Sequence, residues 1–120
     1  DSAFEHGCDA AGGSKEIWLP WKGFNGSKSP FILAQSGPQM MRAWSIAESL
    51  HPAWHACSPP AKRLHARNVL QILGADFETP VDRVIAWTPN AAVVGGTATG
   101  LRLAQHYDIE IVNLANDTQA

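Results

Sequence analysis

The apolar residues of the chain recur at two different spacings, which predict alternating helices and strands. Spacings of three and four positions are typical of a helix with one buried face, and they occur in four segments: residues 1–11, 39–50, 59–73 and 97–106. Short apolar runs predict three strands: residues 16–19, 83–87 and 109–114. Residues 21–38 are rich in Gly, Ser, Asn and Pro, which predicts a long loop of the kind that often carries function.

Capping residues define the ends of the helix predicted at 59–73. Ser58 followed by Pro59 is typical of a helix start, because the serine hydroxyl accepts a hydrogen bond from a free backbone N–H and proline fits the first turn. Gly74 is typical of a residue that follows the last turn of a helix. The bounds of this helix are therefore predicted more sharply than those of the others.

The two last apolar runs define the expected fold class. Residues 83–87 and 109–114 are apolar throughout, which predicts strands buried on both faces. The helix between them favours adjacent parallel strands with a right-handed crossover. The sequence therefore predicts a three-layer α/β Rossmann-like sandwich with a small, mainly parallel sheet, as a single domain over residues 1–120. Three strands are few for such a fold, so we expect either missing strands on the amino-terminal side or a partner subunit, and hence a homo-oligomer.

Composition and charge narrow the class of protein. With 45% hydrophobic and 17% charged residues, the 120-residue chain has the composition of one soluble domain. A net charge of −2 gives no general attraction to nucleic acid, and we interpret the basic cluster of Lys62, Arg63, His65 and Arg67 as a solvated helix face. No apolar run approaches the roughly 20 residues of a membrane span. Two cysteines without a secretory leader predict reduced thiols and a cytoplasmic location.

Histidines and a cysteine between the second and third predicted helices raise the question of a metal site. His51, His55 and Cys57 are close in sequence, and His6 or Cys8 would extend the ligand set. A proline directly after His51 disfavours a regular helix through this segment, and no Cys-x-x-Cys pair or suitably spaced carboxylate accompanies it. We therefore interpret these histidines as ordinary helix-end residues and predict no metal and no cofactor.

A glycine-rich turn separates the strand predicted at 83–87 from the helix predicted at 97–106. Free backbone N–H groups and the positive end of the helix dipole converge at this place, where α/β proteins bind anionic ligands. One interpretation is a tight packing turn whose glycines adopt positive φ. The other is a phosphate site, formed by Gly95, Gly96, Thr97, Thr99 and Thr88.

Polar and aromatic residues elsewhere offer further contacts to a ligand. On the helix predicted at 59–73, Arg67 either pairs with a surface carboxylate or grips a phosphate or carboxylate with its planar guanidinium. Its neighbour Asn68 either satisfies a loop carbonyl or contacts the substrate, and His65 is a further candidate for a substrate contact. In the loop, Trp21 and Phe24 are candidates to stack on a nucleobase.

Four segments taken together resemble small phage and bacterial proteins of the SLOG superfamily: residues 1–5, 16–24, 64–68 and 94–97. That superfamily includes DNA-processing protein A and the Lonely Guy phosphoribohydrolases, and the resemblance covers nearly the whole chain. In those proteins a first strand and a Gly-Gly-x-x-Gly-Ala-Asp segment precede the helix that begins here at Asp1, so this sequence is expected to lack them. Part of the Lonely Guy signature is matched by Gly95, Gly96, Thr97 and Gly100, but its proline and glutamate are not.

The resemblance implies a nucleotide- or phosphate-binding protein and, in its enzymatic form, a hydrolase of the N-glycosidic bond of a nucleoside monophosphate. Of the carboxylates in the matching segments, Glu5 is expected to be catalytic together with Arg67. An alternative is a non-catalytic single-stranded DNA binder resembling DNA-processing protein A, with a groove made by Lys22, Lys28, Lys62 and Arg63. A third is a truncated oligomeric relative with an unrelated hydrolytic activity.

Overall fold

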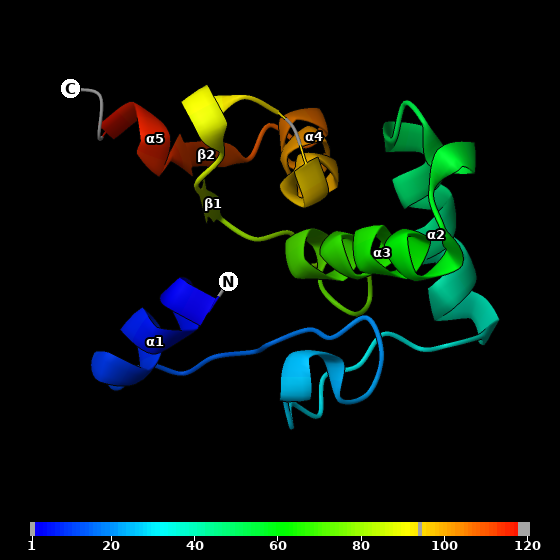
Figure 1. Ribbon diagram of the computed structural model, residues 1–120, viewed down its shortest axis with the longest axis horizontal. Helices are drawn as coiled ribbons and strands as arrows, with labels where there is room; N and C mark the ends of the chain where they lie inside the picture. Colours follow the sequence, from blue (N-terminus) through cyan, green and yellow to red (C-terminus); the bar gives the residue numbers. More distant parts are fainter. Residues whose placement is uncertain (1, 94, 118–120) are drawn as a thin grey trace.

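The structure, a computed structural model, describes residues 2–93 and 95–117 (Figure 1). Its α-helices are α1 (Ser2–Ala10), α2 (Gly37–Leu50), α3 (Pro59–Leu73), α4 (Ala98–His106) and α5 (Leu114–Asp117). Its strands are β1 (Arg83–Ala86) and β2 (Glu110–Asn113). Short 3₁₀ turns connect them: η1 (Phe24–Gly26), η2 (Trp54–Ala56), η3 (Pro89–Ala91) and η4 (Gly95–Thr97). The described part of the chain contains no helix of the length and apolarity that crossing a membrane requires.

The sheet consists of β1 and β2, which pair in parallel. Arg83 lies opposite Glu110 at one end of the pair and Ala86 lies opposite Asn113 at the other. Helix α4 connects the two strands and lies beside them in Figure 1. The prediction of adjacent parallel strands joined through a helix is therefore confirmed, and the chain has an α/β fold.

Two expectations about the sheet are wrong. Residues 16–19 do not form a strand of it, because Leu19 makes only a single parallel bridge, to Ile32. The strands are also not buried on both faces, since Ile85 is 50% exposed and Trp87, directly after β1, is 56% exposed. An apolar run shows that a strand favours burial, but whether the chain supplies a second covering layer depends on tertiary packing.

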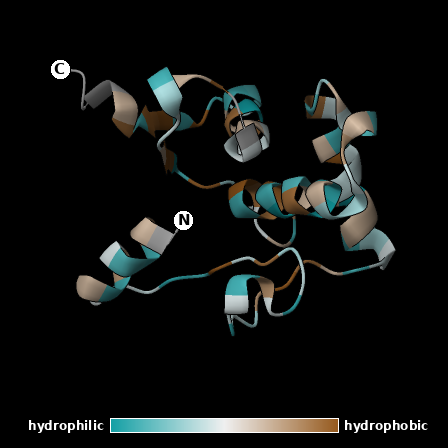
Figure 2. Cartoon of the chain, viewed as in Figure 1, coloured by the Kyte–Doolittle hydropathy of each residue, from teal (hydrophilic) through white to brown (hydrophobic). Residues whose placement is uncertain are grey.

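Helix α3 lies at the centre of the hydrophobic core. It packs against α2 and α4, and the fully buried side chains of Val69, Leu70 and Leu73 face these neighbours. Figure 2 shows hydrophobic and hydrophilic residues alternating along α3, and mainly hydrophobic residues in both strands. The predicted caps are confirmed: the Ser58 hydroxyl accepts a hydrogen bond from the N–H of Ala61, and Gly74 follows the last turn with φ of 80°.

The basic cluster on α3 is not the solvated face that we expected. His65 and Arg67 are buried, with 8% and 9% of their surface exposed, and Lys62 and Arg63 are half-buried. The reason is that a distant segment covers this side of α3. The Arg67 guanidinium donates a hydrogen bond to the carbonyl of Trp18, 49 residues earlier in the chain. A charge pattern along one helix does not reveal such a distant covering segment.

Candidate functional site

A cleft of about 740 Å³ opens between α1, β1, α3 and the start of α4. Its volume is within the range typical of small-molecule sites. Residues from four separate parts of the sequence line it, among them Glu5, Lys15, Trp18, Arg67, Asn68 and Thr97. The structure thus brings together four residues that the sequence singled out: Glu5, Arg67, Asn68 and Thr97.

Arg67 is held inside the fold by hydrogen bonds that do not neutralise its charge. Its Nε donates to Oδ1 of Asn68 over 3.0 Å, and its Nη1 donates to the Trp18 carbonyl over 2.9 Å. Its guanidinium carbon lies 5.7 Å from the centre of the Phe24 ring. Burial lowers the pKa of Arg67, but an arginine remains charged at neutral pH. No carboxylate among the described residues pairs with Arg67, so the interpretation of a surface ion pair is wrong.

Asn68 connects Arg67 to the glycine-rich turn. Its Nδ2 donates to the backbone carbonyl of Gly96 over 2.7 Å, while its Oδ1 accepts from Arg67. Of the two interpretations of Asn68, the structure shows the one in which it satisfies a loop carbonyl. Thr97, the last residue of that turn, is exposed to the cleft and its side chain makes no capping hydrogen bond to α4. The Thr97 hydroxyl and the amino-terminal end of α4 therefore border the cleft.

The turn itself differs from the tight positive-φ turn considered above. Gly95 and Gly96 belong to η4, and Gly96 does not adopt a positive φ in the left-handed region. A Cβ added at Gly96 would meet no heavy atom within 4 Å. Because a 3₁₀ turn has right-handed dihedral angles, this position does not require glycine for backbone reasons. Val94, which precedes the turn, lies outside the described residues.

Several predicted site residues lie elsewhere. Thr88 is buried, and its hydroxyl accepts a 2.7 Å hydrogen bond from Asn113 that joins the ends of the two strands. Thr99 is fully buried, with its hydroxyl 2.8 Å from Nδ1 of His65. Trp21 and Phe24 stack edge to face at 5.3 Å, and neither lines the cleft, although Phe24 contacts Arg67.

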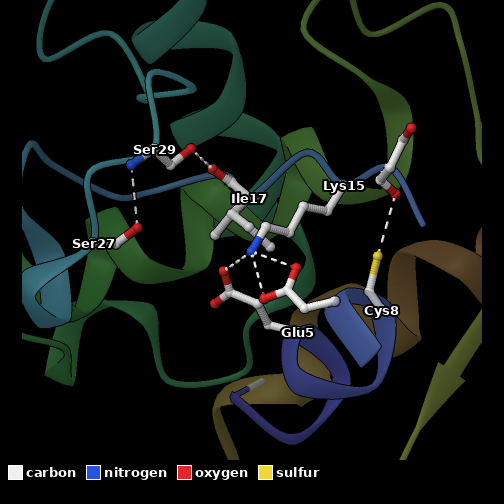
Figure 3. Close-up of polar contacts among 8 residues, drawn as sticks. Glu5, Cys8, Lys15, Ile17, Ser27 and Ser29 are labelled. Atoms are coloured by element: carbon white, nitrogen blue, oxygen red, sulfur yellow. Dashed lines mark hydrogen bonds and ion pairs between the residues drawn. The ribbon is translucent and has the colours of Figure 1, made fainter. Parts of the chain in front are cut away.

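Lys15 is a cleft residue that the sequence interpretation missed. It follows the Gly12–Gly13 turn after α1 and folds back over that helix, so that its Nζ lies 2.5 Å from Glu5 and 2.9 Å from Asp9 (Figure 3). The hydrogen bonds to Glu5 and then to Asp9 raise the pKa of Lys15. Glu5 and Asp9 stand four positions apart, on one face of a helix, which is the signal that would have indicated a nearby cation.

A second polar cluster lies on the other side of α3. His51 caps the end of α2, Cys57 follows η2, and His65 projects from α3, with one ligand atom of each residue within 4.8 Å of the others. His55 and His6 are exposed and lie outside this group, and the half-buried Cys8 lies outside it as well. Burial lowers the pKa of His65, and the nearby His51 and Arg102 lower it further. The candidates His51 and Cys57 thus meet a histidine that was assigned to a different site.

The described residues do not gather the four basic side chains of the expected DNA groove into one place. Lys28 lines a smaller cavity of about 300 Å³ together with Lys15, whereas Lys62 packs over the rings of Trp44 and Trp54. Lys22 is exposed on the loop before η1.

Comparisons with known proteins add no relative: no family model, curated protein or solved structure matches the chain. The resemblance to SLOG proteins rests on the four sequence segments. The cleft around Arg67 and the cluster around His65 are the two features of the structure that point to a function.

Proposed function

We propose that the cleft beside α3 binds the phosphate of a nucleotide or of a similar small molecule. The observation that carries this proposal is the position of Arg67, a buried guanidinium that lines the cleft without a carboxylate partner in the described part of the chain. Burying a charge is costly unless an opposite charge or hydrogen bonds compensate it. Two hydrogen bonds compensate part of this cost at Arg67. A bound anion would supply the opposite charge and would pair with a planar guanidinium in the geometry that arginine favours.

The surroundings of Arg67 suit a phosphate in particular. Its Nε and Nη1 are engaged within the protein, whereas the described residues offer no hydrogen bond to Nη2. The Thr97 hydroxyl and the amino-terminal end of α4 border the same cleft. Together they would offer one charged and several neutral donors to the oxygens of a phosphate.

The aromatic residues of the cleft suit the rest of a nucleotide. Phe4 and Trp87 line it and are 46% and 56% exposed, and Trp18 forms part of its buried wall. Rings with accessible faces are suited to stacking on a base. The base platform in this proposal is therefore formed by cleft residues and no longer by Trp21 and Phe24.

In the enzymatic form of the proposal, the protein hydrolyses the N-glycosidic bond of a nucleoside monophosphate. Arg67 would anchor the phosphate, and Glu5, which lines the same cleft, would accept a proton from the attacking water. The water oxygen bonds to the sugar carbon as the bond to the base breaks, and the proton that Glu5 accepted passes to the departing base. Incubation with nucleoside monophosphates and chromatographic detection of free base tests this form, and Glu5→Gln is expected to abolish the release.

The finer fold assignment belongs to the same proposal. A SLOG-like, three-layer Rossmann-like arrangement is supported by the parallel pairing of β1 and β2 through α4 and by the meeting of segments 1–5, 16–24 and 64–68 at one cleft. In such folds the ligand binds where strands end and helices begin.

Calorimetric titration with nucleoside monophosphates tests binding itself. Loss of a charge-assisted hydrogen bond costs about 1.5–3 kcal/mol, so Arg67→Gln is expected to weaken binding roughly ten- to a hundredfold. Arg42→Gln is the matched control, because Arg42 is an exposed arginine stacked over Phe77 outside the cleft. Equal affinity in wild type and Arg67→Gln, with both folded, would contradict the proposal.

A further inference from the structure

We propose that His51, Cys57 and His65 form a binding site for a borderline-soft transition-metal ion, in the first instance Zn²⁺. Imidazole nitrogen and thiolate sulfur are the ligands that zinc favours in proteins. The three residues come from three different elements, the end of α2, the residue after η2 and the middle of α3. The site is separate from the cleft, whose lining includes none of the three.

The distances are close to those of a tetrahedral ion. With bonds of about 2.0–2.1 Å to nitrogen and about 2.3 Å to sulfur, neighbouring ligand atoms lie about 3.3–3.6 Å apart. Cys57 Sγ is 3.7 Å from Nε2 of His51, and all three ligand atoms lie within 4.8 Å of one another. The rings of His51 and His65 meet edge to face at 4.6 Å. A contraction of about 1.2–1.5 Å at the widest pair would complete the coordination, and water would take the fourth position.

Thr99 is placed to orient the ring of His65 as a metal ligand. The hydroxyl of Thr99, a fully buried residue, lies 2.8 Å from Nδ1 of His65. When Nδ1 carries the proton and donates it to this hydroxyl, Nε2 holds the lone pair that binds an ion. A ligating histidine usually has such a partner on its second nitrogen, and it fixes both the tautomer and the ring.

His51 has to exchange one contact for another. The N–H of Ala53 donates to Nδ1 of His51 over 3.0 Å, which places the ring proton on Nε2, facing Cys57 Sγ. An ion bound at Nε2 moves that proton to Nδ1 and breaks the contact with Ala53, which lies in an exposed turn. The thiol proton of Cys57 leaves as well, so binding releases a proton to the solvent. The thiolate charge offsets the nearby positive charge of Arg102, which acts on His65.

Metal titration of the full chain, stripped of metal with a chelator and kept reduced, tests the site. Calorimetry with Zn²⁺ is expected to give one ion per chain, and Co²⁺ is expected to give the near-ultraviolet absorption of a cobalt–thiolate bond. Cys57→Ser is expected to abolish this absorption, and both Cys57→Ser and His65→Gln are expected to weaken Zn²⁺ binding more than about a hundredfold.

Two matched variants serve as controls, because each removes the same type of side chain outside the cluster. His55 is an exposed neighbour in the same segment, and Cys8 is the second free cysteine. His55→Gln and Cys8→Ser are expected to bind as wild type does. The proposal is overturned if wild type shows no cobalt–thiolate absorption, or if that absorption is lost in Cys8→Ser and retained in Cys57→Ser. The wild-type spectrum decides the question even if a cluster variant fails to fold.

Discussion

The side-chain amide of Asn68 donates a 2.7 Å hydrogen bond to the backbone carbonyl of Gly96 and so joins α3 to the turn before α4. Because the oxygen of the same amide accepts from Arg67, one residue positions both the guanidinium and the turn. Asn68 is 9% exposed, so water has little access to replace either bond. The arrangement of the cleft therefore depends on an amide at this position.

Replacing this amide is expected to cost stability. Asn68→Ala leaves the Arg67 Nε without its acceptor and the Gly96 carbonyl without its donor, and an unsatisfied buried group costs about 1–3 kcal/mol. Chemical denaturation measures the loss. Gln105→Ala is the control, because Gln105 is an exposed amide on α4 and its removal is expected to change stability by less than about 0.5 kcal/mol. Equal stabilities of the two variants would show that the Asn68 bonds are not formed.

Gly96 is expected to tolerate a side chain, whereas Gly74 is not. An added Cβ at Gly96 meets nothing within 4 Å, so Gly96→Ala is expected to keep the melting temperature within a few degrees. At Gly74, φ is +80° and an added Cβ lies 3.3 Å from Thr79, so Gly74→Ala is expected to lose roughly 1 kcal/mol or more. Thermal melts compare the two. A large loss in Gly96→Ala would mean that η4 is more tightly constrained than the structure shows.

A larger side chain at Gly96 tests ligand binding separately from folding. Gly96→Val is expected to remain folded, since the space around it is open, and to lose affinity for nucleoside monophosphates, because a branched side chain keeps an anion away from the backbone. Calorimetry beside a thermal melt gives both quantities. Wild-type affinity in a folded Gly96→Val would place the phosphate away from η4.

Stability is expected to fall on mild acidification because of His65. Burial, and then the charges of His51 and Arg102, lower the pKa of His65 below its ordinary value of 6.5. As the pH falls, the unfolded chain therefore binds a proton at this histidine before the folded chain does. The contribution of neutral His65 to the free energy of unfolding is fully present above pH 6.5 and is lost as the pH falls from there toward the folded-state pKa. Urea denaturation at pH 7.5 and 5.5 measures the difference. The change in the free energy of unfolding between the two pH values is expected to be smaller in His65→Gln. An unchanged difference would assign the effect to other groups.

Thr99 is expected to tune metal affinity without touching the metal. Thr99→Val keeps the shape of the side chain but removes the hydroxyl beside Nδ1 of His65, and loss of such an orienting partner weakens binding about 10- to 100-fold. Thr99→Ser restores the hydroxyl and is expected to restore most of the affinity. Zn²⁺ titration of both variants is the measurement. A Thr99→Ser variant as weak as Thr99→Val would assign the effect to packing.

Self-association remains a prediction, and the exposed face near β1 is where we expect it. Ile85 and Trp87 are 50% and 56% exposed, an unusual amount for large apolar side chains on one strand and its end. Both also line the cleft, so self-association here would cover part of the proposed ligand site. Sedimentation at micromolar concentration is expected to give an oligomer, and Ile85→Lys is expected to shift it toward monomer. Met41→Lys is the control, because Met41 is 71% exposed on α2. A monomeric wild type would contradict the prediction.

The sequence predicted local structure well where the residues that determine it lie within one segment of the chain. The bounds of α3 follow from Ser58, Pro59 and Gly74, and the pairing of β1 with β2 follows from two apolar runs around a helix. The burial of Arg67 could not be predicted in this way, because the carbonyl that it binds belongs to Trp18, 49 residues away. For the same reason the spacing between His51 and Cys57 did not indicate His65, which only the packing of α2 on α3 brings to them.

The bond between Arg67 and Trp18 has a consequence for how the protein opens. It links the chain ahead of α2 to the central helix across 49 residues, beside the core packing of Trp18 and Leu33. The backbone bonds of Leu19 to Phe31 and Leu33 lie within the segment itself. In the described part of the chain, no backbone–backbone hydrogen bond ties residues 15–35 to α3, so we expect this segment to open more easily than the core helices, by local unfolding below the global free energy. Each such opening hydrates Arg67 and removes one wall of the cleft. An anion held by Arg67 would therefore stabilise the closed segment. It would slow amide hydrogen exchange and proteolysis in residues that it does not touch.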